Sequence, residues 1–145
     1  MIPLNKFRPI SRLETPNNQL LRSKFPVIDA HNHLARTRDA AALVAKMDLF
    51  NIRLIVNLDG FWDARMEEQF LLFSDPYPNR FAIFCRVDLT DIDLPDFTVR
   101  TRKYLKSCVR RGVVGIKFSK SLGVKLTDRQ GHYLKPDDDR LRVVW

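Results

Sequence analysis

"FPVIDAHNHL", residues 25–34, is an apolar run that ends in two histidines, His31 and His33. A short apolar run of this kind is typical of a β-strand. Because side chains alternate along a strand, we expect Asp29 to share one face with His31 and His33. Ile28 would then point to the opposite face, where helices would pack. The chain has three histidines in all, so the presence of two of them here requires an explanation.

The two histidines are spaced to hold one metal ion. His33 falls at the carboxyl end of the predicted strand, where barrels and open α/β sheets keep their active sites. Imidazoles at positions i and i+2 on one face can both reach a single ion, and neutral imidazole is a common zinc ligand. The alternative is a pair of hydrogen-bonded polar residues at a strand end. The apolar strand that precedes them favours the metal site.

A β-α rhythm follows this first strand. Strands are predicted over 26–33, 53–59, 80–88 and 113–119. Helices are predicted between them, over 37–51, 62–73 and 96–111. The repeat of about thirty residues is that of one unit of a parallel sheet. The fold class is therefore α/β, and four such units make either a small open domain or the front half of a (β/α)8 barrel, which needs ~250 residues.

Special residues mark the ends of these elements. Thr37 is expected to cap the first helix, while Asn51 and Gly112 are expected to end the first and third helices in a left-handed conformation. The segment 123–135 is predicted to form a small hairpin around "DRQG", inserted after the fourth strand. The last ten residues, 136–145, resemble the start of a helix capped by an Asp.

The first residues, 1–24, are set apart from this rhythm. Pro3, Pro9 and Pro16 interrupt them, so we expect an extended arm and not a helix. The rest of the chain, 25–145, is expected to form a partial barrel domain that is truncated before strand five. With 145 residues, of which 45% are hydrophobic, the chain is long enough to bury the core of one domain.

The cysteines and the absence of long apolar segments bear on the compartment. Cys85 and Cys108 follow no metal or redox spacing, and we expect both to be buried or half-buried thiols of a reducing compartment. The first ten residues lack the apolar region of a signal peptide. No window approaches the ~20 apolar residues of a membrane span. We therefore expect a cytoplasmic protein without a membrane partner.

A net charge of +8 raises the question of a nucleic-acid partner. Six basic residues and no acidic one lie between Arg100 and Arg111. Arg102, Lys106 and Arg110 recur every four residues, so they form one stripe on a helix. The stripe is either a phosphate-binding face or a solvated outer face. Aromatic interleaving of the RNA-binding type is absent, which favours the solvated face and no nucleic-acid partner.

All four predicted strands turn polar at the carboxyl end. Besides the histidines of the first strand, the residues concerned are Asn57 and Asp59, Arg86 and Asp88, and Lys117 and Ser119. Their strands end at the same edge of a parallel sheet, so we expect one site at that rim. Solvation of strand ends could explain each residue alone, but a Lys117 that points to the interior is costly unless it is paired or functional. Asp59, Arg86 and Lys117 are candidates for contact with a substrate.

The motif "VIDAHNHL", the regular β-α units and the stretch "RRGVVGIKFSKSLG" (110–123) together resemble the amidohydrolase superfamily. Over most of the chain, the closest resemblance is to the amidohydrolase-related (amidohydrolase-2) branch of TIM-barrel metal-dependent hydrolases and decarboxylases. The resemblance implies the N-terminal half of a (β/α)8 TIM barrel. It also implies a divalent metal, usually zinc, that activates water or polarises a substrate carbonyl or carboxylate. His31 and His33 match the strand-one ligand pair of the family.

The chain also departs from the family pattern. The other metal ligands of the family, a His from strand five, often a His from strand six and an Asp from strand eight, lie in strands that this chain does not reach. No catalytic residue can therefore be assigned. His132 matches no ligand position, and we expect it at the surface or in a lid. Lys117 stands near a lysine that is carboxylated and bridges two metals in some branches; we favour a contact with a substrate carboxylate instead.

Three functions stay open on the sequence. The first is an enzyme, a metal-dependent hydrolase or decarboxylase of a small molecule, inactive as the isolated chain. The second is a non-catalytic α/β fragment or partner-assembled module that keeps the histidines as a relic or as half of a metal site. The third is a basic nucleic-acid-binding domain. In a half barrel the outer strands lack neighbours, so we also expect homo-oligomers through exposed sheet edges and uncovered interior residues such as Ile55 and Phe84.

Overall fold

The computed structural model describes residues 3–10, 12–13 and 21–145. The predicted arm, 1–24, lies partly outside these residues, and its boundary with the domain stays a prediction. Within the described part of the arm, Leu4–Lys6 form a single 3-10 turn, η1, where we expected no helix. The regular α/β structure begins at Val27.

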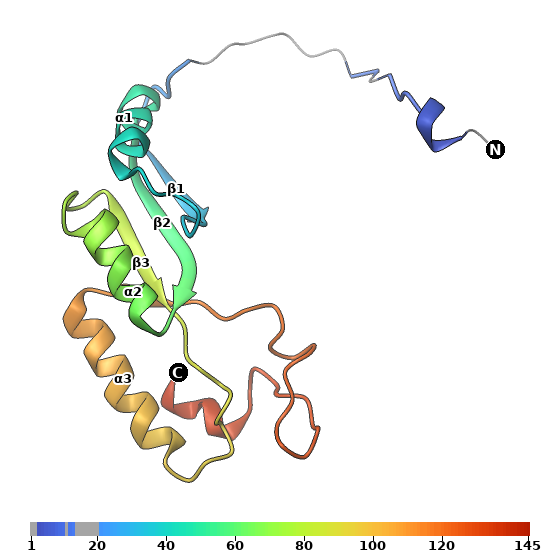
Figure 1. Cartoon of the computed structure of the whole chain (residues 1–145), viewed down its shortest axis with the longest axis vertical. Helices are drawn as coiled ribbons and strands as arrows, with labels where there is room; N and C mark the ends of the chain where they lie inside the picture. Colours follow the sequence, from blue (N-terminus) through green and yellow to red (C-terminus); the bar gives the residue numbers. More distant parts are fainter. Residues whose placement is uncertain (1–2, 11, 14–20) are drawn as a thin grey trace.

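In the described part of the chain, four strands form one sheet in which all neighbours are parallel (Figure 1). They are β1 Val27–Asn32, β2 Ile52–Phe61, β3 Phe81–Cys85 and β4 Gly115–Ile116. The order β1-β2-β3-β4 confirms the predicted α/β class and the sequential parallel sheet. The fourth strand is shorter than the predicted 113–119, although the N–H of Lys117 still donates to the carbonyl of Cys85 at 2.7 Å.

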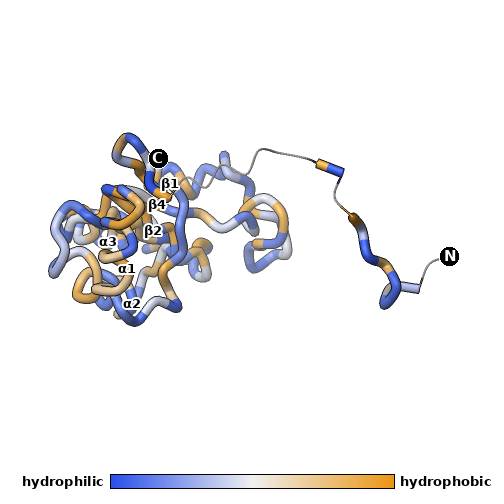
Figure 2. Tube along the Cα trace, turned by 90° about the horizontal axis from the view of Figure 1, so that it is seen from above, coloured by the Kyte–Doolittle hydropathy of each residue, from blue (hydrophilic) through white to orange (hydrophobic). Residues whose placement is uncertain are grey.

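The three α-helices of the described residues lie on the same side of the sheet (Figures 1 and 2). They are α1 Ala40–Phe50, α2 Ala64–Gln69 and α3 Phe97–Arg111. A π-helical turn, η2 Phe70–Ser74, continues α2. The helix start predicted in 136–145 is a 3-10 turn, η3 Asp139–Val143, capped by Asp138. None of the helices formed by the described residues is long and apolar enough to cross a membrane.

The ends of α1 and α3 are set by capping chemistry. The carboxylate of Asp39 accepts a hydrogen bond from the N–H of Ala42 at 2.8 Å, so Asp39 caps α1 and the prediction of Thr37 is wrong. The N–H of Thr37 instead closes a turn onto the carbonyl of Leu34. At the other ends, Asn51 (φ 62°) and Gly112 (φ 107°) adopt the left-handed conformation, as predicted.

The main core lies between the sheet and the layer of α1, α2 and η2. Its buried side chains are Leu34, Ala40, Met47, Ile55, Phe70, Phe73, Phe81 and Ile83. Ile55 is 2% exposed, so our expectation of an uncovered Ile55 is wrong. It pairs with Phe81 across the sheet, and both side chains face the helices. Phe84 alternates with Ile83 and lies on the opposite face, as predicted, but it is half-buried and not uncovered. Burial of each such apolar side chain contributes about 1.5–3 kcal/mol relative to exposure.

A second core joins the carboxyl end of β3 to α3, η3 and the segment after β4. Its buried side chains are Val87, Ile92, Phe97, Leu134 and Leu141. The predicted hairpin is present in a short form, with an antiparallel bridge between Thr127 and Tyr133. The guanidinium of Arg140 forms ion pairs with Asp93, Asp128 and Asp138. These ion pairs link the hairpin and η3 to the loop before α3, so the segment after β4 is a packed part of the domain.

Candidate functional site

The carboxyl ends of the four strands meet at one edge of the sheet, as the parallel order requires. This edge carries the polar residues that the sequence singled out. The histidines lie at the end of β1, Asp59 near the end of β2, Arg86 directly after β3, and Lys117 directly after β4. Hydrogen bonds and close approaches connect them in pairs, and the geometry of each pair decides what the rim can do.

The first strand differs from the prediction at Asp29. Asp29 pairs with Ile55 and Asn32 with Asn57, so β1 has one residue more than β2 between the two pairs. Asp29 and Asn32 therefore share the helix-facing side with Ile55, and the amide of Asn32 donates to the Asp29 carboxylate at 2.6 Å. The same carboxylate accepts the N–H of His31 at 3.2 Å. The extra residue separates Asp29 from the histidine face, so our assignment of Asp29 and Ile28 to their faces is wrong.

The two histidines remain together in spite of this shift. The ring centroids of His31 and His33 are 5.4 Å apart, with 58° between the ring planes. Since Asn32, between them, faces the helix layer, both imidazoles point to the opposite side of the sheet. Both residues are exposed. The prediction that the pair shares one face at the carboxyl end of β1 is confirmed.

Asp59 connects the end of β2 to the end of β1. Its Oδ1 lies 3.1 Å from Nδ1 of His33, and its Oδ2 accepts the N–H of Leu34 at 2.8 Å. The Asp59 side chain is only 8% exposed, whereas that of His33 is 56% exposed. A carboxylate that holds Nδ1 fixes the ring orientation and leaves Nε2 facing outward. Asp59 therefore orients the imidazole ring of His33. Its direct contact with a substrate stays a prediction.

A buried amide pair stands behind Asp59. The side-chain carbonyl of Asn57 accepts the N–H of Asp59 at 3.1 Å, and the Asn57 amide donates to Oε1 of Gln69 in α2 at 3.0 Å. Asn57 is 1% exposed and faces the helix layer. Our expectation that Asn57 belongs to the rim site is therefore wrong. Gln69 was not among the residues predicted from the sequence. The available signal was its position on the inner side of α2, three residues after Met66 and next to Phe70, where a polar side chain needs a partner.

Arg86 and Lys117 come together over Gly60. A Cβ atom built on Gly60 would lie 3.1 Å from the Cβ of Lys117 and 3.4 Å from the Cβ of Arg86, and Gly60 has a φ of +62°. The backbone of β2 can adopt this conformation and approach β4 because Gly60 has no side chain. Arg86 and Lys117 are therefore on the face away from the helices, as predicted for Lys117.

Arg86 has few partners within the described residues. Its Nη2 donates to the carbonyl of Asp59 at 3.2 Å, and its guanidinium lies 5.7 Å from the centre of the Trp62 ring. Its Nε is buried and has no hydrogen-bond partner. Among the described residues neither Arg86 nor Lys117 forms an ion pair. The rim thus carries two cations that have no carboxylate partner in the part of the chain that the structure describes.

A pocket of about 390 Å³ opens beside Arg86. Its wall includes Trp62, Arg86, Asp88, Phe118, Ser119 and Ser121 on the strand side. The hairpin side contributes Leu126, Thr127 and Leu134. The predicted strand-end residues Arg86, Asp88 and Ser119 therefore share this pocket, while the histidines and Lys117 do not line it. Trp62, which we assigned to the second helix, precedes α2 and lies in the loop after β2.

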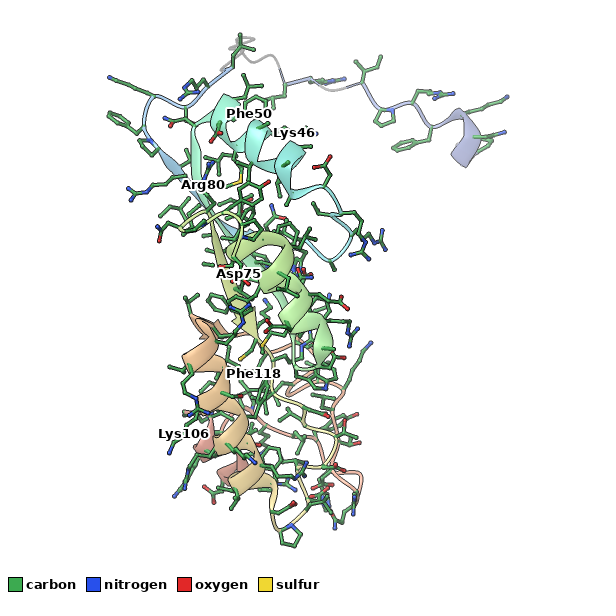
Figure 3. All side chains as sticks on the ribbon, turned by 60° about the vertical axis from the view of Figure 1, so that its left-hand side comes forward. Lys46, Phe50, Asp75, Arg80, Lys106 and Phe118 are labelled. Carbon is green, nitrogen blue, oxygen red and sulfur yellow. The ribbon has the colours of Figure 1, made fainter. Side chains whose placement is uncertain are left out.

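Two other predicted features lie apart from the pocket. The side chain of His132 is 79% exposed and lies 3.6 Å from Asp128, so it is a surface residue, as expected. Arg102, Lys106 and Arg110 line shallow hollows on the outer face of α3, where Lys106 points away from the domain (Figure 3). Phe118, by contrast, lies in the interior beside α3 (Figure 3). The basic stripe and the pocket are therefore separate surfaces.

In the described part of the chain, no three His, Cys, Asp or Glu side chains are gathered so that they could hold a metal ion. Both cysteines are free and buried, as predicted, and burial raises the pKa of the Cys85 thiol to about 12.

Comparison with known proteins finds no matching family model, no similar curated protein and no similar solved structure.

Proposed function

We propose that the chain is the N-terminal half of a TIM-barrel metal-dependent hydrolase or decarboxylase of the amidohydrolase-2 type. The observation that carries the proposal is the pair of imidazoles at the end of β1, with Nδ1 of His33 held by Asp59 at 3.1 Å. The open sheet of four parallel strands supports it, since such a sheet is the inner layer of half a barrel.

The histidine pair fits a divalent metal, with zinc as the preferred ion. A ligand histidine almost always donates its second ring N–H to a carboxylate, a carbonyl or water, and the carboxylate of Asp59 is placed to accept it from His33. Nε2 of His33 is then the free ligand atom, and His31 supplies a second imidazole on the same face. When bound, the metal would activate water or polarise a substrate carbonyl or carboxylate.

The remaining rim residues would bind and orient the substrate. Arg86 and Lys117 place two positive charges on the face of the sheet that carries the histidines. They suit an anionic or carbonyl-bearing group of a small substrate. The side chain of Asn57, bonded to Gln69, accepts the backbone N–H of Asp59 and so helps to fix the position of Asp59 beside His33. The two buried free thiols are in keeping with a reducing, cytoplasmic setting, which forms part of this proposal.

Metal titration tests the proposal directly. Zinc binding to the purified chain is measured by calorimetry and compared between the unaltered chain, the double variant His31→Ala/His33→Ala and the control His132→Ala. We expect weak binding of one ion, loss of binding in the double variant and no change in the control. Binding that survives the double variant with its affinity unchanged would remove the metal site and, with it, the proposed function.

Turnover separates this proposal from a non-catalytic module. Catalytic zinc commonly has three protein ligands, and the described residues offer two imidazoles. We therefore expect no hydrolysis of esters or lactones and no decarboxylation by the zinc-loaded chain alone. Activity that appears when the later strands of a barrel are supplied favours the enzyme, while metal binding with no activity in any such assembly favours a non-catalytic module.

A further inference from the structure

We propose that the outer face of α3 binds an acidic, amphipathic peptide segment of another protein. Carboxylates of the segment would meet the basic residues of this face, and its apolar side chains would meet the valines between them. The residues of the face are all exposed, and they are Val99, Arg102, Lys103, Lys106, Val109 and Arg110. None of them lies at the rim of the sheet, so the inference goes beyond the proposed function and does not depend on it.

The first argument is that the positive charges of this face are not neutralised. The arginines near the two ends of α3 have carboxylate partners: Nε of Arg100 lies 2.9 Å from Asp96, and Nε of Arg111 lies 2.8 Å from Glu67. The four basic residues of the outer face form no ion pair with any residue that the structure describes. Like charges four residues apart on a helix repel each other, and an anionic partner would relieve that repulsion.

The second argument is that apolar side chains lie among these charges. Val99 is 68% exposed and Val109 is 72% exposed. Val99 borders a shallow hollow of about 280 Å³, and Val109 borders one of about 390 Å³ together with Leu105 and Val143. Both hollows share the same three basic residues, Arg102, Lys106 and Arg110. A partner that fills the hollows therefore needs apolar groups as well as negative charges.

The third argument concerns which protein could supply the negative charges. The chain has 25 basic and 17 acidic residues, so a second copy would bring a further net charge of +8. Two of the aspartates at the hairpin, Asp128 and Asp138, are already paired with Arg140. Repulsion between two such chains opposes their association through this face. The partner is therefore a different protein with an acidic segment.

The composition of the face favours a peptide over nucleic acid or a membrane. Nucleic acid would supply phosphates, but the face has no aromatic side chain on which bases could stack. A helix that lies in a membrane surface carries its charges on one side and large apolar residues on the other. Here the charges lie among two valines, and Lys106 points straight away from the domain (Figure 3). A helical peptide that presents acidic and apolar residues on one face matches this pattern.

The test uses a labelled synthetic peptide of 15 residues, the length of α3, with Glu at every fourth position and Leu between them on the same face. Two control peptides carry Gln in place of Glu, or Ser in place of Leu. Binding to the full chain is measured by fluorescence anisotropy at about 0.15 M salt. We expect the acidic, apolar peptide to bind at least about tenfold more tightly than either control, because charge-assisted and apolar contacts both contribute.

Variants with matched controls locate the surface. Lys106→Glu should weaken peptide binding by about tenfold or more, whereas Lys46→Glu, at an exposed lysine of α1, should leave it unchanged (Figure 3). Val109→Ser should weaken binding by about threefold or more, whereas Leu71→Ser, at a leucine of η2 that is 62% exposed, should not. Circular dichroism checks that each variant is folded. If Lys106→Glu does not fold, the comparison of the three peptides on the unaltered chain decides.

Several outcomes would overturn the proposal. They are no binding of the acidic peptide, equal affinity for the acidic peptide and either control peptide, and unchanged binding by folded Lys106→Glu. A short DNA duplex and vesicles of equimolar phosphatidylcholine and phosphatidylserine are titrated in parallel. Tighter binding of either one than of the peptide, lost in Lys106→Glu, would assign this face to nucleic acid or to a membrane surface instead.

Discussion

At the scale of single residues, Asp59 forms the hydrogen bonds that connect neighbouring strands at the rim. Its carboxylate bonds the Nδ1 of His33 and the N–H of Leu34, while its backbone carbonyl accepts from Arg86. One aspartate thus connects the ends of three strands. Because it is nearly buried and is held in turn by Asn57, its position is set by the fold and not by the ligand. Changes at this residue are expected to act on the histidines rather than on the chemistry of a substrate.

The first prediction concerns Asp59→Ala. Loss of the carboxylate frees the His33 ring and leaves the N–H of Leu34 without its acceptor. We expect zinc affinity to fall by about 10–100-fold, the usual effect of removing a partner that orients a metal ligand. The control is Asp88→Ala, whose carboxylate bonds Thr90 instead. Calorimetric zinc titration provides the measurement, and an unchanged affinity in Asp59→Ala would show that His33 needs no such support.

The second prediction concerns Cys85, whose thiol pKa is raised by burial to about 12 from a usual 9.0. At about pH 8 the folded chain should therefore leave Cys85 unreactive toward a thiol reagent until it is unfolded. Above about pH 9 the unfolded thiol loses its proton and the folded one keeps it, so the free energy of unfolding should fall between about pH 9 and 12. Urea unfolding across this range checks the sign, and Cys85→Ala should flatten the slope. Rapid labelling of the native chain at Cys85 would contradict the buried thiol.

At the scale of elements, two glycines bring β2, β3 and β4 together. Gly60 permits the approach of β2 to the ends of β3 and β4, and Gly115 lies beneath the ring of Phe84 on the neighbouring strand. A Cβ on Gly115 would lie 2.3 Å from Cε1 of that ring, closer than real atoms approach. The short fourth strand is therefore held against β3 by a contact that only glycine allows, and the position of Lys117 depends on it.

The third prediction is a double-mutant cycle at this contact. Gly115→Ala should cost about 1–3 kcal/mol in the free energy of unfolding, because the methyl group must displace the ring of Phe84. In the background of Phe84→Leu the ring edge is absent, and the cost of Gly115→Ala should be smaller by a measurable coupling energy. Urea unfolding of the four proteins supplies the cycle. Equal costs of Gly115→Ala in both backgrounds would show that the ring does not oppose the methyl group.

At the scale of the whole molecule, helices cover one side of the sheet, and no other described strand pairs with the outer edge of β1. β1 is an edge strand, and Val27 and Ile28 are exposed along it; Ile28 is 57% exposed. Phe25, just before the strand, is exposed as well. An apolar edge strand with free backbone groups is a template for pairing with another chain. The expected homo-oligomer through sheet edges stays a prediction, and this edge is its natural location.

The fourth prediction tests that edge. The purified chain should self-associate as its concentration rises, and Ile28→Lys should shift the equilibrium toward monomer because a lysine on an edge strand opposes pairing. Val99→Lys, at an exposed valine on α3, serves as the control and should have little effect. Sedimentation at several concentrations measures both. A chain that stays monomeric throughout, or an equal shift in the two variants, would place any association elsewhere.

Local patterns in the sequence were enough to locate most elements. Alternating and helical periods, with Asn51 and Gly112 as helix ends, predicted the strands and helices to within a few residues, because these signals act over one or two turns of chain. The β-α repeat likewise predicted the parallel order of the strands. The spacing of His31 and His33 was likewise sufficient to place both rings on one face.

Tertiary structure alone decided which side chains meet at the rim. One extra residue in β1 separates Asp29 from the histidines, and it is visible only in the pairing with β2. Asn57 faces Gln69, Asp59 reaches back to His33, and Gly60 brings Arg86 beside Lys117. The pocket beside Arg86 exists because the hairpin folds back over the strand ends. Each contact joins residues distant in the chain and depends on register, and a shift of one residue reverses every face, so no local pattern could have specified them.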